Sequence, residues 1–323
     1  MRELVEHKRL VEISDRIDPR LGNLVRIETL AEVRVRDGSI PILGWVIGTP
    51  DRSKPTLGVF GGVHGLERVG SHVILAYLEY LLGRLVWDRQ LRDLLARDAR
   101  IVSIPIVNPG GMLLRWRSNP RGVDLMRNAP GPDAPGAFPL VGGHRIGPWL
   151  PWYRGKAEEP LELESRTLCE FVRKEMFGSV AAVAMDLHSG FGMQDQLWYP
   201  YARSNEPFPD SARVERIKGL FDRTHTHHVY RIEPQSDVYT ISGDLWDHLY
   251  DESRKHHGES GVFIPWTLEM GSWQWLRKNP SQVFRPFGLY DPILPHRYKR
   301  VMRRHLPMLD FFFQAAVNWE AWA

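Results

Sequence analysis

The chain has 323 residues, of which 43% are hydrophobic and 25% are charged, and its formal net charge is +3. This composition is typical of a globular protein with a large core, and the small basic excess mildly favours anionic over cationic ligands. The single cysteine, Cys169, excludes an intrachain disulfide and a cysteine-based zinc site. The charged first 19 residues lack the apolar stretch of a signal peptide, and we find no membrane-spanning run, so we expect a cytoplasmic protein that binds no membrane.

Strand-like segments dominate the first 60 residues, which we expect to be strands joined by turns. Segments 24–35 and 40–47 are predicted to pair across a tight turn at Asp37-Gly38. Short apolar runs typical of buried strands follow, at residues 56–60, 100–107, 179–187 and 261–268.

Apolar residues at 3- and 4-residue spacing separate these runs and predict helices over 67–85, 91–95 and 161–176. Residues 128–156 are rich in Gly and Pro and should form an irregular excursion. Residues 297–323 should be helical on both sides of Pro307, which is expected to kink the helix or to start a new one. We find no linker or repeat, so the pattern predicts a single α/β domain over residues 1–323, with helices on both faces of a sheet.

Three of the predicted strands are followed by polar residues that suit a metal centre. His64 and Glu67 follow the first, His188 the second and Glu269 the third. Functional groups in open α/β sheets gather at the carboxyl ends of strands. Two imidazoles and one carboxylate can hold Zn²⁺ with one position open for water, and Glu269 would accept a proton from that water.

These residues lie in motifs that resemble the zinc carboxypeptidase family, which includes carboxypeptidase A. The resemblance covers residues 57–270 and rests on six motifs in chain order: GGVHGLE at 61–67, NPGG at 108–111, RSNPRGVDLMRN at 117–128, LHSG at 187–190, YTISGD at 239–244 and TLEMG at 267–271. It implies an α/β fold with a mixed, mostly parallel eight-stranded sheet between helices. It also implies one zinc ion bound by His64, Glu67 and His188, with Glu269 as the general base.

The resemblance assigns further roles by position. Arg117 would stabilise the oxyanion, a role for which Arg115 competes less well by spacing. Arg127 would bind the terminal carboxylate of a peptide, and Tyr239 would close over the bound residue. The family usually has Asn before this arginine, but here Met126 cannot donate a hydrogen bond. Arg127 could therefore be a structural ion-pair partner, and the substrate could be an amidated, branched or otherwise unusual peptide, or a non-peptide amide.

Two residues at the end of the tyrosine motif and just after it fall near the expected specificity pocket. Asp244 could select a basic side chain or could be a turn residue, and Trp246 could form the pocket wall or fill the pocket. Asp186, two residues before His188, could support that ligand or have no special role. A cluster of five histidines, His225, His227, His228, His256 and His257, is better explained as surface residues than as a second metal site.

The expected function is hydrolysis of an amide bond at or near a peptide C-terminus. One alternative is a deacylase of small N-acyl amino acids, resembling aspartoacylase and succinylglutamate desuccinylase, and another is an inactive binding protein on the same fold. The partner is therefore a peptide or small amide. We expect no nucleic acid, because the basic stretch 297–305 has the spacing of a solvated helix face. The oligomeric state stays open.

Overall fold

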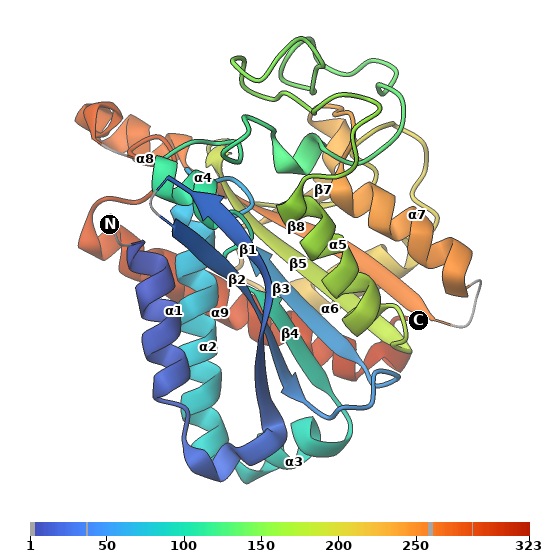
Figure 1. The fold of residues 1–323 in the computed structure, drawn as a ribbon. Coiled ribbons are helices and arrows are strands. Elements are labelled where there is room, and N and C mark those ends of the chain that lie inside the picture. The colour runs from blue at the N-terminus through green and yellow to red at the C-terminus, as the bar shows by residue number, and fades with distance from the viewer. Residues whose placement is uncertain (1–3, 37, 258–260, 286) are drawn as a thin grey trace.

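An eight-stranded sheet forms the centre of the molecule, in the order β1-β2-β4-β3-β5-β8-β6-β7 (Figure 1). The computed structural model describes residues 4–36, 38–257, 261–285 and 287–323. The strands are β1 (Val25–Val35), β2 (Gly38–Gly48), β3 (Thr56–Gly61), β4 (Arg100–Ile104), β5 (Ala181–Phe191), β6 (Gln196–Tyr199), β7 (Arg231–Pro234) and β8 (Val262–Gly271).

The sheet is mixed, as predicted. The pairs β3–β4, β3–β5, β5–β8 and β6–β7 are parallel, whereas β1–β2, β2–β4 and β6–β8 are antiparallel. The predicted pairing of the first two strands is confirmed, although Asp37 of the expected turn lies outside the described residues. The parallel strands β3, β4 and β5 are buried along nearly their whole length, which explains their unbroken apolar runs.

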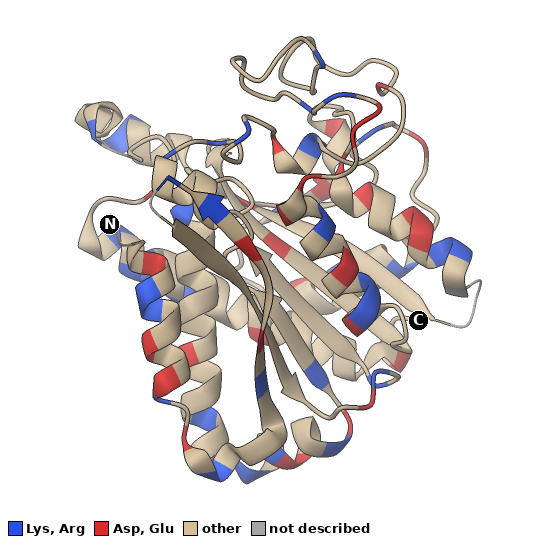
Figure 2. Cartoon of the chain, viewed as in Figure 1, with Lys and Arg blue, Asp and Glu red and all other residues tan. Residues whose placement is uncertain are grey.

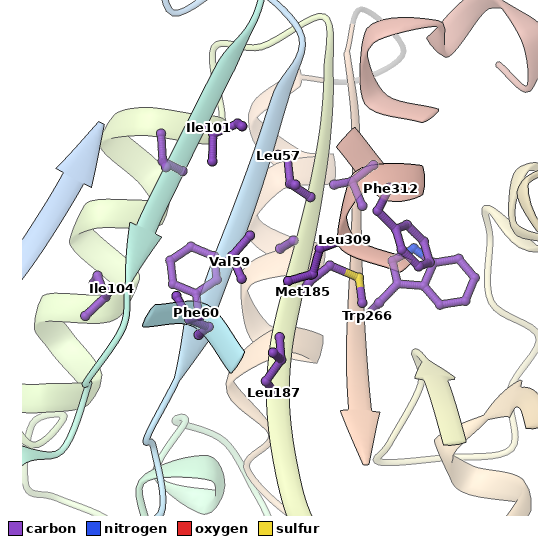
Figure 3. Packing of buried hydrophobic residues seen from close by; sticks show 14 of the residues in the cluster. Leu57, Val59, Phe60, Ile101, Ile104, Met185, Leu187, Trp266, Leu309 and Phe312 are labelled. Carbon is purple, nitrogen blue, oxygen red and sulfur yellow. The ribbon is translucent and has the colours of Figure 1, made fainter. Parts of the chain in front are cut away.

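Helices cover both faces of the sheet. The helices are α1 (Val5–Asp15), α2 (Arg68–Trp87), α3 (Arg89–Arg97), α4 (Pro109–Leu114), α5 (Leu163–Met176), α6 (Ser211–Thr224), α7 (Leu245–His257), α8 (Trp273–Lys278) and α9 (Pro295–Val317). Helices α2 and α9 contact each other and strands β3 and β5, whereas α5 and α7 pack together, with α5 against β1 and β3 and α7 against β8. Side chains from β3, β5, β8 and α9 meet in one hydrophobic core (Figure 3).

The expectation of strands at the N-terminus was wrong, and one of the two alternatives for Pro307 is excluded. Residues 5–15 form helix α1 and not a strand, because Leu10 and Ile13 are buried at helical spacing and α1 packs against α2. Helix α9 continues through Pro307, so this proline does not start a new helix. Proline leaves the carbonyl of Arg303 without its helical partner, and both residues are exposed, so water can satisfy that carbonyl. The excursion 128–156 contains, as predicted, no strand longer than an isolated bridge between His144 and Tyr153.

Helix α2 is strongly apolar, although Glu79 and Arg84 interrupt it, so it is not the uncharged membrane-spanning run that the sequence was expected to lack. It is the one helix within the described residues that is long and apolar enough to cross a membrane, judged by length and composition alone. More than half of that apolar stretch is buried inside the fold, where Val69, Val73 and Leu81 belong to the core. The core helix of a globular protein meets the same criterion, so the composition of α2 reflects its central packing.

Candidate active site

The central strands place the predicted site residues at one edge of the sheet. The segment after β3 carries His64 and Glu67 and leads directly into α2. His188 in β5 and Glu269 in β8 are direct partners in the parallel register of these neighbouring strands. Gly65 allows the turn to close, because a β-carbon there would lie 2.2 Å from the carbonyl carbon of Gly111.

Two histidines and one glutamate converge on a single point. The Nδ1 atom of His64 lies 2.9 Å from Oε1 of Glu67, and the Nδ1 atom of His188 lies 3.0 Å from Oε2 of the same carboxylate. One ligand atom from each of the three residues lies within 4.8 Å of the other two, and they form the only such metal-type group that we find among the described residues. Imidazole nitrogen and carboxylate oxygen are zinc ligands, so this donor set fits one zinc ion.

The far side of each imidazole contacts a buried aspartate. Nε2 of His64 lies 3.0 Å from Oδ1 of Asp124, and Nε2 of His188 lies 2.8 Å from Oδ2 of Asp186. Metal-binding histidines commonly donate their other ring N–H to a carboxylate, which fixes the tautomer and the ring orientation. The two aspartates thus leave both Nδ1 atoms available to a metal. Asp186 was expected either to support His188 or to have no special role, and the structure places it in contact with His188.

Asp124 is a functional residue to which the sequence analysis gave no role. It is completely buried, and besides His64 it accepts hydrogen bonds from Nε of Arg117 (3.0 Å) and Nη1 of Arg127 (3.1 Å). The available signal was its place in the GVDLMRN motif, between the two arginines that had been singled out. Burial opposes ionisation of Asp124, but Arg127, Arg117 and His64 hold its pKa well below the usual range.

The carboxylates of Glu67 and Glu269 have opposite electrostatic environments. Burial opposes ionisation of Glu67, but His64 and His188 hold its pKa well below the usual value, so it stays anionic, as a metal ligand must. Burial, together with the nearby charge of Glu67, raises the pKa of Glu269 to about 8. Glu269 accepts one hydrogen bond, from the backbone N–H of Phe191 at 2.9 Å. Glu269 can therefore exchange a proton near neutral pH, which suits a general base.

A cavity of about 500 Å³ opens over these groups and has the size of a small-molecule or peptide-end site. It contains the metal-type group together with Glu269, Arg117, Arg127, Tyr239 and Asp244. Aromatic side chains supply much of its wall: Phe138, Trp152, Phe191, Trp198, Trp273 and Tyr290. Phe138 and Trp152 belong to the irregular excursion at 128–156, which thus contributes to the cavity. Charged residues elsewhere lie mostly on the outer helices and loops (Figure 2).

Both predicted arginines line the cavity but are held differently. Arg117 donates from Nη1 to Glu67 at 2.9 Å and from Nε to Asp124 at 3.0 Å, and its side chain keeps 21% of its surface exposed. Arg127 is almost fully buried and donates from Nε to the carbonyl of Val141 at 2.9 Å, besides its bond to Asp124. Arg115 lies over the ring of Phe287, 5.4 Å from its centre, and is absent from the cavity wall.

Of the remaining predicted residues, Tyr239 and Asp244 line the cavity and Trp246 does not. The ring of Tyr239 packs 5.6 Å from that of Phe191. Asp244 accepts the N–H groups of Trp246 and Asp247, each at 2.8 Å, and so caps helix α7; burial raises its pKa to about 6.

Trp246 turns toward the core and not toward the substrate cavity. Its ring packs 5.2 Å from that of Phe60, and its Nε1 donates to Asp186 at 2.8 Å. Trp246 was expected to form the wall of the pocket or to fill it, but it does not line this cavity. The tryptophan instead supports the aspartate behind His188.

Two histidines of the predicted cluster pack on a phenylalanine. The rings of His225 and His228 stack on Phe221 at 4.8 and 4.7 Å, and no second metal-type group is found in the part of the chain that was described. The side chain of His257 lies outside the described residues.

Comparison with known proteins agrees with this geometry. Carboxypeptidase SOL1 of Arabidopsis thaliana is 31% identical over 244 residues, which are 72% of this chain and 44% of that protein. The chain spans less than half the length of the curated relatives it matches.

Solved structures share the fold. The crystal structure of thrombin activatable fibrinolysis inhibitor matches with a TM-score of 0.69 at 18% identity, over 97% of this chain and 74% of that one. Carboxypeptidase A from Helicoverpa armigera matches with a TM-score of 0.63 at 19% identity, over 96% and 71%. A family model described as zinc carboxypeptidase matches residues 33–279, which is well over half of the chain. The chain therefore belongs to the zinc carboxypeptidase family.

Proposed function

We propose that this protein is a zinc-dependent hydrolase that cleaves an amide bond at or near the C-terminus of a peptide. The observation that carries the proposal is the position of Glu269 beside the metal-type group. Glu269 pairs with His188 across two central strands, lines the same cavity as His64 and Glu67, and is not itself part of that group. A free carboxylate beside a His₂Glu site is what hydrolysis by activated water requires.

The roles of the protein groups follow from their positions. Zinc bound at His64, Glu67 and His188 would lower the pKa of a coordinated water and polarise the substrate carbonyl. Glu269 would accept a proton from that water on its carboxylate and pass it to the leaving amine. Arg117, beside Glu67, would direct its unused N–H donors at the developing oxyanion.

The proposal also concerns how the protein recognises the C-terminus of a peptide. Arg127 uses Nε and Nη1 for protein acceptors, and its neighbour Met126 lines the cavity with a thioether that donates no hydrogen bond. A C-terminal carboxylate would thus meet only the remaining donors of one buried guanidinium. We therefore expect a weak preference for the free acid over the C-terminal amide. A strong preference for the free acid in a comparison of the two peptides would contradict this expectation.

Replacement of Glu269 tests the enzyme assignment. In zinc-loaded protein, Glu269→Gln should lower the rate of peptide hydrolysis by about 10²–10⁴-fold, the usual contribution of a positioned proton-transfer group. Zinc content should be unchanged, because Glu269 is outside the ligand group. Glu164→Gln is the matched control: this glutamate on α5 is also buried and has a raised pKa from burial, but it does not line the cavity.

Products are identified by mass spectrometry on a panel of peptides, peptide amides and N-acyl amino acids. Wild-type rates for Glu269→Gln would overturn the role of Glu269 as the general base, whereas no hydrolysis by the zinc-loaded wild type would leave the binding-protein alternative. Selective cleavage of small N-acyl amino acids would favour the deacylase alternative.

A further inference from the structure

A second cavity lies on the other side of helix α8 from the catalytic one. It measures about 250 Å³ and is formed by the end of β8, by α8 and by the first half of α9. Trp273, the first residue of α8, lines the catalytic cavity, whereas Lys278, the last, lines the second cavity. No residue lines both, so this space is separate from the proposed substrate site.

Positive charge dominates the wall of this second cavity. Four permanently charged cations line it, Lys278, Arg297, Arg300 and Arg304, against the single carboxylate of Asp195. Asp195 is already occupied, because Oδ1 accepts the N–H of Gly271 at 3.0 Å and Oδ2 is bonded to Arg304. The cavity therefore has an excess of positive charge that the protein itself does not neutralise.

The three arginines lie on one face of α9 at the expense of helix stability. They are spaced three and four residues apart, and like charges at that spacing destabilise a helix. Arg297 also lies in the first turn of α9, where the helix dipole disfavours a cation. An anion in the cavity would reverse both effects.

The guanidinium groups still have many N–H donors to offer. Arg297 donates from Nη1 to the carbonyl of Trp275 at 2.9 Å, and Arg304 donates from Nη1 to Asp195. A guanidinium has five N–H donors, so these two bonds hold the side chains in place and leave most donors unused. Within the described ranges, Arg300 and Lys278 form no hydrogen bond or ion pair with the protein.

We propose that this second cavity binds a small tetrahedral oxyanion, namely a phosphate group, either free or carried on a small molecule. Planar guanidinium groups match the spacing of phosphate oxygens and bind them in pairs. The cavity volume suits one compact anionic group and is too small for a nucleic-acid strand. The solvated-face interpretation still applies to Lys299 and Arg303, which do not line the cavity, whereas Lys278 and Arg300 are exposed at its rim.

The test is calorimetric titration of the zinc-loaded protein with inorganic phosphate, and separately with phosphoserine, at constant ionic strength. The cavity variant Lys278→Gln/Arg300→Gln should bind about tenfold or more weakly, the loss expected from at least one charge-assisted hydrogen bond. The control variant Lys299→Gln/Arg303→Gln removes the same charge from the same helix region outside the cavity and should bind like the wild type. Equal rates of peptide hydrolysis in all three proteins would show that both variants are folded.

Tight binding of phosphoserine but not of inorganic phosphate would support the proposal and identify a carried phosphate as the ligand. The proposal is overturned if the wild type binds neither probe, or if both variants weaken binding equally. It is also overturned if only a long polyanion such as heparin binds.

Discussion

Replacement of Asp124 by asparagine is the sharpest test of how the site is built. The carboxylate accepts from Nε2 of His64 and from Arg117 and Arg127, all within 3.1 Å. Oδ2 accepts from both arginines and Oδ1 contacts only His64, so the single oxygen of asparagine should stay with the arginines and its amide N–H₂ should face the imidazole. His64 would then lose its acceptor, and the two arginines would lose a negative partner in a fully buried position.

Two effects of different size should follow from Asp124→Asn. Leaving a buried cation without its partner costs roughly 3–5 kcal/mol of folding stability, measured by urea unfolding. Losing the acceptor for the imidazole of His64 should weaken zinc binding by roughly 10–100-fold, measured by competition with a chelator. The pKa of Asp124 is held below its unfolded value, so its stabilising contribution is present above about pH 4 and is lost as the pH falls through the folded pKa. The variant should lack that acid-dependent loss.

A matched control separates the site from general destabilisation. Asp247 is also buried and accepts hydrogen bonds from Ala202 and Arg203, but it does not line the cavity. Asp247→Asn should leave zinc affinity unchanged. If folded Asp124→Asn bound zinc as tightly as the wild type, the supporting role that we assign to Asp124 would be refuted.

Three further results are expected. Trp246→Phe removes the N–H donated to Asp186 together with part of the ring that packs on Phe60. Zinc affinity should fall by less than roughly tenfold, and an unchanged dissociation constant would contradict the supporting contact. Gly65→Ala places a methyl group against the backbone of Gly111 and should lower the free energy of unfolding by about 1–3 kcal/mol; a neutral result in urea would contradict that approach. In the metal-free protein, the raised pKa of Glu269 means that stability falls as the pH rises from about 4.5 toward 8. The melting temperature of metal-free Glu269→Gln should therefore exceed that of the wild type more at pH 8 than at pH 5, and the reverse order would refute the assignment.

The site residues on strand ends could be predicted because their signals are local. An apolar run predicts a buried strand, a glycine marks its end, and the polar residue that follows must lie at the edge of the sheet. His64, Glu67, His188 and Glu269 were all found in this way, and the structure brings them together. The family resemblance and the mixed sheet were confirmed, whereas the cytoplasmic location stays a prediction.

The sequence by itself determined which side chains could hold zinc, because ligand chemistry and the strand-to-turn pattern are properties of short segments. Only the tertiary structure decided what lies behind those ligands. Asp124 is 60 residues from His64, and Trp246 is 60 residues from Asp186, so no local periodicity relates the members of either pair. The direction of each of these side chains depends on which strands and loops pack beside it, and that is established only when the whole core has formed.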